Sequence, residues 1–308
     1  MKLLLLLSLL LRPAIQDSLL VVSWNVENFL DYRTDSTGRH TSGRFYSKCN
    51  AIAKTLLLIA ERNGRLPDAV ALMEVGDRFV LERLIGSTPL RKLDYAIVHY
   101  DSPDRRGIDC ALLYRRSRLR LRNSFAAHLY DADGAVMPTR DILAAEFDSL
   151  AILVNHHPSK VGADSERRRG IAMRRMTELM DSLWRRSDFY ADTCAANRQH
   201  THYNGAGPHT FFGPAPSGYP VLAVGDYNDD VWHDGSPGTI KYNGSWEKID
   251  GHFARGLTVR ETVFADPSLS EPDRTWGGVK PRRAFSGPRW LGGVSDHYPI
   301  VLIITPLR

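Results

Sequence analysis

The stretch GGVSDHYPI occupies residues 292–300 and leads directly into an apolar run at 300–304. An apolar run of this length predicts a buried strand. Asp296 and His297 therefore lie where the strand begins, and a rigid strand fixes the geometry of the side chains at its end. A carboxylate beside an imidazole suits acid–base chemistry, but the pair alone identifies no reaction. Its meaning depends on what the rest of the chain places nearby.

Four other predicted buried strands also end in polar residues capable of chemistry. They are Asn25 in the run 19–26, Glu74 in 68–75, His156 at the end of a hairpin over 141–157, and Asp226 with Asn228 in 221–228. One polar residue at a strand end is usually a hydrogen-bonded turn group. Five such ends, all carrying acid, amide or imidazole groups, predict convergence on one rim of the fold.

The residue types at these ends favour metal-assisted hydrolysis of a phosphoester. Glu74 and Asp296 are hard oxygen ligands, and Asn25 adds a neutral carbonyl oxygen. Such a set suits Mg²⁺, with Mn²⁺ or Ca²⁺ as alternatives. Zinc is not predicted, because the chain has no HExxH motif and no cluster of Cys and His. A histidine that activates water needs a carboxylate partner to fix its tautomer. Asp109 and Asp250 are candidate partners, although Asp109 also fits an ordinary surface turn.

The spacing of apolar residues predicts one domain built mainly from strands. Helices are expected at 46–63, where Asn63-Gly64 ends the pattern, at 79–85 and at 165–186. Further strands are expected at 95–100, 110–115, 119–125 and 298–305. The strands do not alternate regularly with helices, so a Rossmann-type fold is excluded. A sandwich of two sheets with helices outside fits better.

Seven motifs, taken in chain order, resemble a known family. They are SWNVENF (23–29), LMEV (72–75), GIDCALLY (107–114), NHHPSK (155–160), GDYND (225–229), WEKID (246–250) and SDHYP (295–299). The ordered set is similar to the endonuclease/exonuclease/phosphatase superfamily of deoxyribonuclease-like enzymes, and most similar to an exported bacterial branch. The resemblance runs from about residue 19 to the end. It implies an α/β (α+β) fold, a four-layer α/β-sandwich of two packed mixed β-sheets flanked by helices.

The resemblance also implies a role for each residue that matches a motif. On the metal side it implies Asn25, Glu74 and Asp296, and for the water and the phosphoryl oxygens it implies Asp226 and Asn228. The two active-site histidines are His156 and His297, with Asp109 and Asp250 as their respective partners. His157 directly follows His156, and the family pattern favours His156 because it comes immediately after Asn155.

These features predict an exported Mg²⁺-dependent phosphodiester hydrolase, and among such enzymes a nuclease. A phosphatase or a sphingomyelinase-like phosphodiesterase is the alternative, followed by a non-catalytic binding module. The net charge of +5 and clustered arginines fit a nucleic-acid substrate, but they equally fit a solvated arginine-rich surface. No stable protein partner is indicated, and we expect a monomer.

The N-terminus resembles a secretory signal. Lys2 precedes an apolar run at 3–11 that is shorter than the roughly 20 residues needed to span a bilayer. We therefore expect a signal peptide over 1–18 and the phosphohydrolase domain over 19–308. A buried first strand or helix is the alternative. Cys49, Cys110 and Cys194 fit no zinc spacing, and the first two lie in apolar patterns typical of a core.

Overall fold

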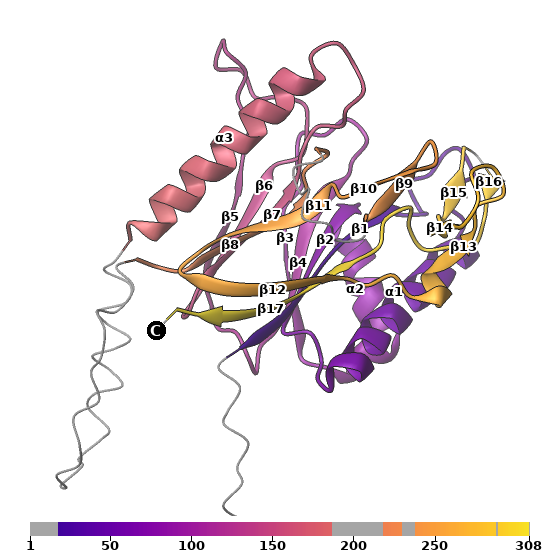
Figure 1. Ribbon diagram of the computed structural model, residues 1–308, viewed down its shortest axis with the longest axis horizontal. Helices are drawn as coiled ribbons and strands as arrows, with labels where there is room; N and C mark the ends of the chain where they lie inside the picture. Colours follow the sequence, from indigo (N-terminus) through magenta and orange to yellow (C-terminus); the bar gives the residue numbers. More distant parts are fainter. Residues whose placement is uncertain (1–17, 187–217, 230–237, 288, 308) are drawn as a thin grey trace, which may run out of the picture.

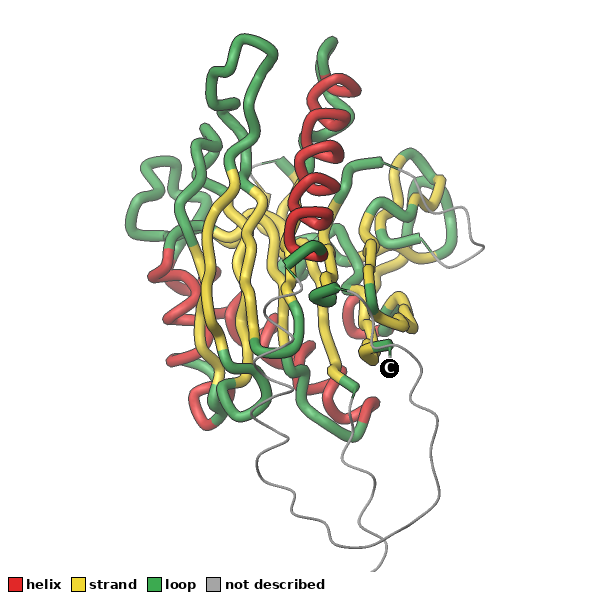
Figure 2. Tube along the Cα trace, turned by 90° about the vertical axis from the view of Figure 1, so that its left-hand side faces the viewer, coloured by secondary structure: helices red, strands yellow, loops and turns green. Residues whose placement is uncertain are grey.

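The computed structural model describes residues 18–186, 218–229, 238–287 and 289–307. The predicted signal peptide, apart from Ser18, lies outside the described residues, as do Cys194 and most of the loop 187–220. The described chain forms four layers, in which two sheets pack face to face between helices (Figures 1 and 2). The predicted four-layer sandwich is therefore confirmed.

The first sheet has six strands in the order β12-β17-β1-β2-β4-β3. Only β1 and β2 run parallel to each other, so the sheet is mixed. The C-terminal strand β17 lies inside the sheet, between β1 and β12. The strands are β1 (Leu19–Phe29), β2 (Ala69–Val75), β3 (Tyr95–His99), β4 (Asp109–Arg115), β12 (Leu257–Val263) and β17 (Ile300–Pro306).

The second sheet has five strands in the order β11-β8-β7-β6-β5. It is also mixed, because β7 and β8 are parallel and the other pairs are antiparallel. The strands are β5 (Leu121–Ala127), β6 (Ile142–Phe147), β7 (Ala151–His156), β8 (Val221–Asp226) and β11 (Asp250–Arg255).

Helices cover the outer face of each sheet. The helices α1 (Ser42–Asn63) and α2 (Arg78–Gly86) pack on the six-stranded sheet, and α3 (Ser165–Trp184) packs on the five-stranded sheet (Figure 1). The predicted end of α1 is confirmed, since Gly64 adopts a left-handed conformation with φ of 65° and its N–H bonds the carbonyl of Glu61.

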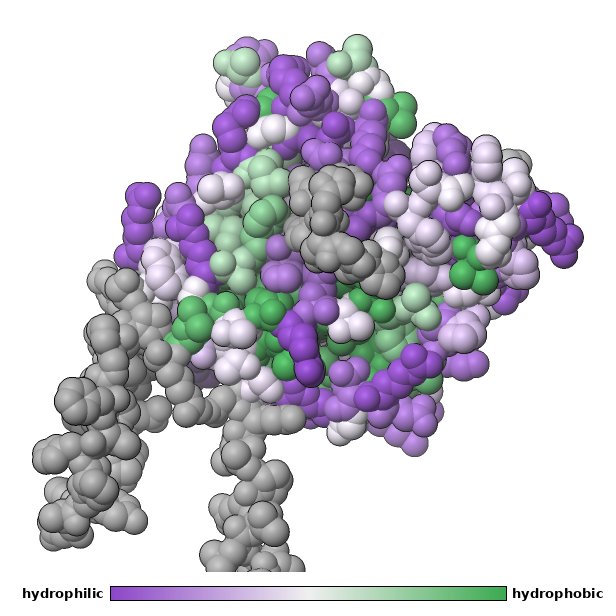
Figure 3. All heavy atoms as spheres, viewed as in Figure 1, coloured by the Kyte–Doolittle hydropathy of each residue, from purple (hydrophilic) through white to green (hydrophobic). Residues whose placement is uncertain are grey.

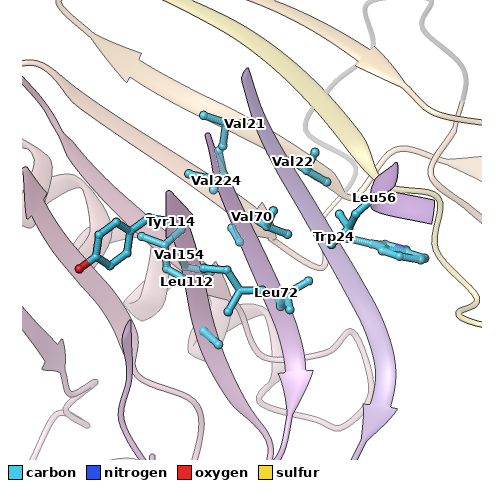
Figure 4. Close-up of a cluster of buried hydrophobic side chains, with 14 of the residues drawn as sticks. Val21, Val22, Trp24, Leu56, Val70, Leu72, Leu112, Tyr114, Val154 and Val224 are labelled. Atoms are coloured by element: carbon cyan, nitrogen blue, oxygen red, sulfur yellow. The ribbon is translucent and has the colours of Figure 1, made fainter. Parts of the chain in front are cut away.

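The hydrophobic core fills the space between the sheets and under α1. Figure 4 shows Val21 of β1 beside Val224 of β8, and Val154 of β7 beside Leu112 of β4. Side chains of a strand alternate between its two faces. Consecutive apolar residues in β1 therefore pack alternately into the core between the sheets and into the layer between the sheet and α1. Cys49 and Cys110 are buried and free, as expected for core residues.

Short strands in the C-terminal third were not predicted, because three or fewer residues carry no period. They are β9 (Ile240–Tyr242), β10 (Ser245–Glu247), β13 (Ser270–Pro272), β14 (Val279–Pro281), β15 (Phe285–Ser286) and β16 (Arg289–Trp290). Two 3₁₀ turns complete the described elements, η1 (Pro89–Lys92) after α2 and η2 (Pro267–Leu269) after β12. Hydrophobic residues show around β12 and β17 on the face in Figure 3. Among the described residues, no helix is both apolar and long enough to cross a membrane.

Strand direction brings the polar strand ends together. The parallel strands β1, β2, β7 and β8 end at the same rim at which their antiparallel neighbours β4, β11 and β17 begin. The register pairs Asp226 with both His156 and Asp250, and pairs Val75, next to Glu74, with Asp109. The predicted convergence on one rim is therefore a direct consequence of the two mixed sheets.

The glycine of the GDYND motif is required by this arrangement. A Cβ at Gly225 would lie 1.9 Å from the carbonyl oxygen of Asn155 on the paired strand β7. We predict that Gly225→Ala destabilises the protein by at least about 3 kcal/mol, because the backbone of β7 or β8 must move. Chemical denaturation measures the loss. Gly86→Ala is the control, since no atom lies within 4 Å of its Cβ position. Equal stability of both variants would contradict the packing described here.

Candidate active site

A hydrogen bond between Asn25 and Asp226 joins the two sheets at the rim. The Nδ2 of Asn25 donates to Oδ2 of Asp226 over 3.0 Å, and both residues are almost completely buried. The other carboxylate oxygen, Oδ1, accepts from the backbone N–H of Asn228 at 2.9 Å. Asn228 adopts a positive φ of 52° and donates its side-chain N–H to the carbonyl of His157. The turn after β8 therefore holds both Asp226 and Asn228 in fixed positions.

The second predicted histidine forms the pair that the sequence indicated. Nδ1 of His297 lies 2.8 Å from Oδ2 of Asp250, and its Nε2 lies 3.9 Å from Oδ2 of Asp226. The backbone of His297 is also fixed, since its carbonyl accepts from the indole N–H of Trp24. The predicted Asp250–His297 pairing is therefore present, and its role in a reaction stays a prediction.

The predicted Asp109–His156 pairing is wrong. Asp109 lies 3.2 Å from Nε2 of His99 and accepts from the backbone N–H of Ser102. The reason is strand order: β3 pairs with β4 and places His99 opposite Ala111, so the His99 ring reaches the side chain of Asp109, two residues away on the same face of β4. Nδ1 of His156 is buried without a hydrogen-bond partner among the described residues.

His156 itself faces the other site residues. Its Nε2 lies 3.6 Å from Oδ2 of Asp226 and 3.9 Å from Oε1 of Glu74. His157 instead packs edge-on against the ring of Tyr227, with the ring centroids 4.9 Å apart. The choice of His156 over its neighbour thus agrees with the geometry.

Burial and charge separate the protonation states of these residues. Burial, together with the nearby Asp250, raises the pKa of Asp226 to about 7. Burial alone would lower the pKa of His297, but Asp250 and Asp226 more than offset it and hold that pKa well above its usual value. Burial and then the charge of Arg140 lower the pKa of His156 well below its usual value. At neutral pH the site therefore contains a cationic His297, a neutral His156 and an Asp226 close to its midpoint.

The donor atoms on the metal side fit a hard divalent cation. Glu74 adopts a strained φ of 60° and uses Oε2 to accept from the backbone N–H of Asn28. Its Oε1 accepts no hydrogen bond from the described residues and lies 4.0 Å from Nη1 of Arg106. Asp296 contacts Arg283 through Oδ2, while Oδ1 lies 3.8 Å from Nε2 of His297. Asn25 adds an amide oxygen that accepts one backbone N–H, from Glu27. One or two carboxylate oxygens and an amide oxygen suit an ion that keeps several waters.

The described residues contain two further groups with metal-ligand spacing. Asp226, Asp250 and His297 bring ligand atoms within 4.8 Å of one another, and so do His99, Asp101 and Asp109. The first group overlaps the candidate site. In the second group Asp101 is exposed, and the carboxylate of Asp109 is already bonded to His99 and Ser102.

Three charged residues of the site were not predicted. Glu27 is almost fully buried and binds Arg283, and the ammonium of the buried Lys48 contacts the backbone carbonyl of Glu27. Burial lowers the pKa of Lys48 to about 8. Glu27 could have been found, because it lies two residues after Asn25 in SWNVENF and alternation along a strand puts both on one side. Arg283 lies in a loop and gave no such signal.

Comparison with known proteins agrees with the residues found at the rim. A model of the Endonuclease/Exonuclease/phosphatase family matches residues 21–189, which is more than half of the 308-residue chain. The chain belongs to this family. The activities in the family name all cleave phosphoesters, and membership makes the protein a metal-dependent phosphoester hydrolase in general terms. None of the curated proteins matches the chain.

Several solved structures share the fold. A humanized TDP2 from D. rerio is 15% identical with a TM-score of 0.54, and the match covers 94% of this chain and 99% of that one. An endonuclease/exonuclease/phosphatase family protein from Bacteroides thetaiotaomicron is 14% identical with a TM-score of 0.54, covering 94% and 98%. The human Nocturnin catalytic domain, solved with a bound sulfate anion, is 16% identical with a TM-score of 0.50, covering 95% and 96%.

The Asp250–His297 contact predicts a measurable change in one variant. Asp250→Asn removes the carboxylate that stabilises the imidazolium, so the pKa of His297 should fall and phosphoesterase activity should drop by about 10²-fold. NMR titration of the histidine ring protons measures the pKa. The control is Asp141→Asn, which removes the 2.8 Å partner of His128 instead. An unchanged His297 titration in Asp250→Asn would refute the pairing.

Proposed function

We propose that the protein is a Mg²⁺-dependent phosphodiester hydrolase that acts as an endonuclease on nucleic acid. The observation that carries this proposal is the buried Asp226 carboxylate, whose Oδ2 lies 3.6 Å from Nε2 of His156 and 3.9 Å from Nε2 of His297. A neutral and a cationic imidazole near one carboxylate provide both a hydrogen-bonding group and a positive charge for a phosphate. Hard oxygen donors for a metal ion lie at the same rim.

Each residue then has a role that follows from its protonation state. Asp226, with a pKa of about 7, is suited to take a proton from the attacking water, and Asn228 fixes the orientation of that carboxylate. The cationic His297 stabilises negative charge on the phosphoryl oxygens, and His156 donates or accepts a hydrogen bond beside it. Asn25, Glu74 and Asp296 would hold the metal ion, which when bound polarises the phosphoryl group.

Two observations support nucleic acid as the substrate class. The chain has a net charge of +5, which favours a polyanion through counterion release. A TDP2 from D. rerio with the same fold was solved in complex with a single-strand DNA product. We also propose that the protein acts as a monomer without a stable protein partner.

A second candidate is a phosphodiesterase or phosphatase that acts at a lipid surface. Trp276 is 61% exposed, and the β9–β10 hairpin exposes Trp246, at 40%, and Tyr242. Exposed tryptophans favour contact with a membrane interface. A panel of plasmid DNA, RNA, sphingomyelin and inositol phosphates separates the candidates directly. A non-catalytic module would hydrolyse none of them.

The nuclease proposal predicts a metal-dependent nicking activity. Purified protein should nick supercoiled plasmid with Mg²⁺ and stop when EDTA is added. His156→Ala should reduce the rate by about 10²-fold or more, because acid–base and hydrogen-bonding groups contribute factors of this size. His128→Ala is the control, since this half-exposed histidine binds Asp141 outside the site. Absence of nicking with every divalent metal would refute the nuclease.

We further propose that the chain is exported through a signal peptide at 1–18. The support is the sequence itself, with Lys2 before an apolar run at 3–11. Expression of the full chain in a bacterium with a secretion pathway should yield a mature protein that begins near Leu19, as measured by N-terminal sequencing. Lys2→Glu should slow this processing. A cytoplasmic protein that keeps Met1 would refute export.

A further inference from the structure

One guanidinium joins two carboxylates that lie far apart in the sequence. Arg283 is in the loop between β14 and β15. Its Nε and Nη2 donate to Oε1 of Glu27 at 3.2 and 3.1 Å, and Nη2 also lies 2.9 Å from Oδ2 of Asp296. Arginine is always charged, and its planar fork can donate to two carboxylates at once. Arg283 is thus a permanent positive charge between Glu27 and Asp296.

The carboxylate of Glu27 is fully used by protein groups. Oε1 accepts from Arg283, and Oε2 accepts from the backbone N–H of Ala284 at 2.7 Å. The side chain is only 4% exposed. The ammonium of Lys48 adds a second cation, because it contacts the backbone carbonyl of the same residue. A metal ion that approaches Glu27 would therefore have to displace both a guanidinium and a backbone donor.

Without Arg283, two carboxylates of this rim would lie close together with no cation between them. One atom, Nη2 of Arg283, lies 3.1 Å from Oε1 of Glu27 and 2.9 Å from Oδ2 of Asp296. Glu74 lies at the same rim, since its Oε1 is 3.9 Å from Nε2 of His156. Two-metal hydrolytic sites hold their ions about 4 Å apart on shared carboxylates.

Within the described part of the chain, Oε1 of Glu74 and Oδ1 of Asp296 accept no hydrogen bond, although Oε1 of Glu74 lies 4.0 Å from Nη1 of Arg106. The amide oxygen of Asn25 accepts one backbone N–H, from Glu27. This set suits one ion with bound waters.

We propose that Arg283 is a resident cation that closes the Glu27 side of the rim and limits it to one divalent ion. The inference rests on the proposed metal site at Asn25, Glu74 and Asp296, and it assigns the side chain that controls how many ions bind there. Arg283 acts by positioning Glu27 and Asp296. It is not assigned a step in the reaction.

The experiment counts bound Mn²⁺ by electron paramagnetic resonance of the free ion during titration. Arg283→Gln should bind one Mn²⁺ more per chain than the wild type, because Glu27 and Oδ2 of Asp296 become available. The double variant Glu27→Gln/Arg283→Gln should return to the wild-type number. Arg282→Gln is the matched control, since this exposed neighbour makes no contact with either acid in the described structure. It should leave the number unchanged.

Each outcome separates this inference from the proposed function. A wild type that binds Mn²⁺ and an Arg283→Gln variant that binds the same number overturn the inference alone. A wild type that binds none overturns the proposed metal site itself. If Arg283→Gln unfolds without metal, because a buried carboxylate has lost its partner, saturating Mn²⁺ should restore the folded circular dichroism spectrum. Failure of Mn²⁺ to restore it would also count against the inference.

Discussion

The hydrogen bond between Asn25 and Asp226 is the contact on which the site depends. Asn25 lies where the regular pairing of β1 with β2 breaks, and Asp226 ends β8 of the other sheet, so the bond fixes how the two sheets meet at the rim. Both groups are buried, and an unpaired carboxylate there would cost more free energy than the bond itself contributes. The packed core determines the distance between the sheets. At that distance the bond can form, and it holds the groups that would surround a phosphate in fixed positions.

The same burial that makes the bond necessary also sets the chemistry. Asp226 lies near the carboxylate of Asp250, and the cationic His297 lies between them. Burial raises the pKa of the acid, and the two acids stabilise the imidazolium. Neither shift requires an unusual residue. Both pKa shifts follow from burying three ordinary titratable groups together, because charges interact more strongly in a buried site than in water.

The sequence predicted the layers and most of the rim because both depend on local patterns. Buried strands such as 19–26 and 221–228 are recognised as apolar runs in the sequence. Their functional residues are recognised as polar residues that end those runs. The partner of Asp109 was predicted incorrectly, because it depends on which strand lies beside β4. Strand order is a property of the whole sheet, which a motif does not contain. Arg283 was missed for a related reason: its partners are 256 and 13 residues away, and its own loop shows no periodicity.

The central position of β17 has a consequence for when the enzyme becomes active. This strand lies between β1 and β12, and the residues just before it carry Asp296 and His297. The first sheet is therefore split until β17 has been synthesised, and no product that stops before β17 contains a complete site. In this topology the growing chain cannot hydrolyse a phosphoester before β17 has been synthesised and has joined the sheet.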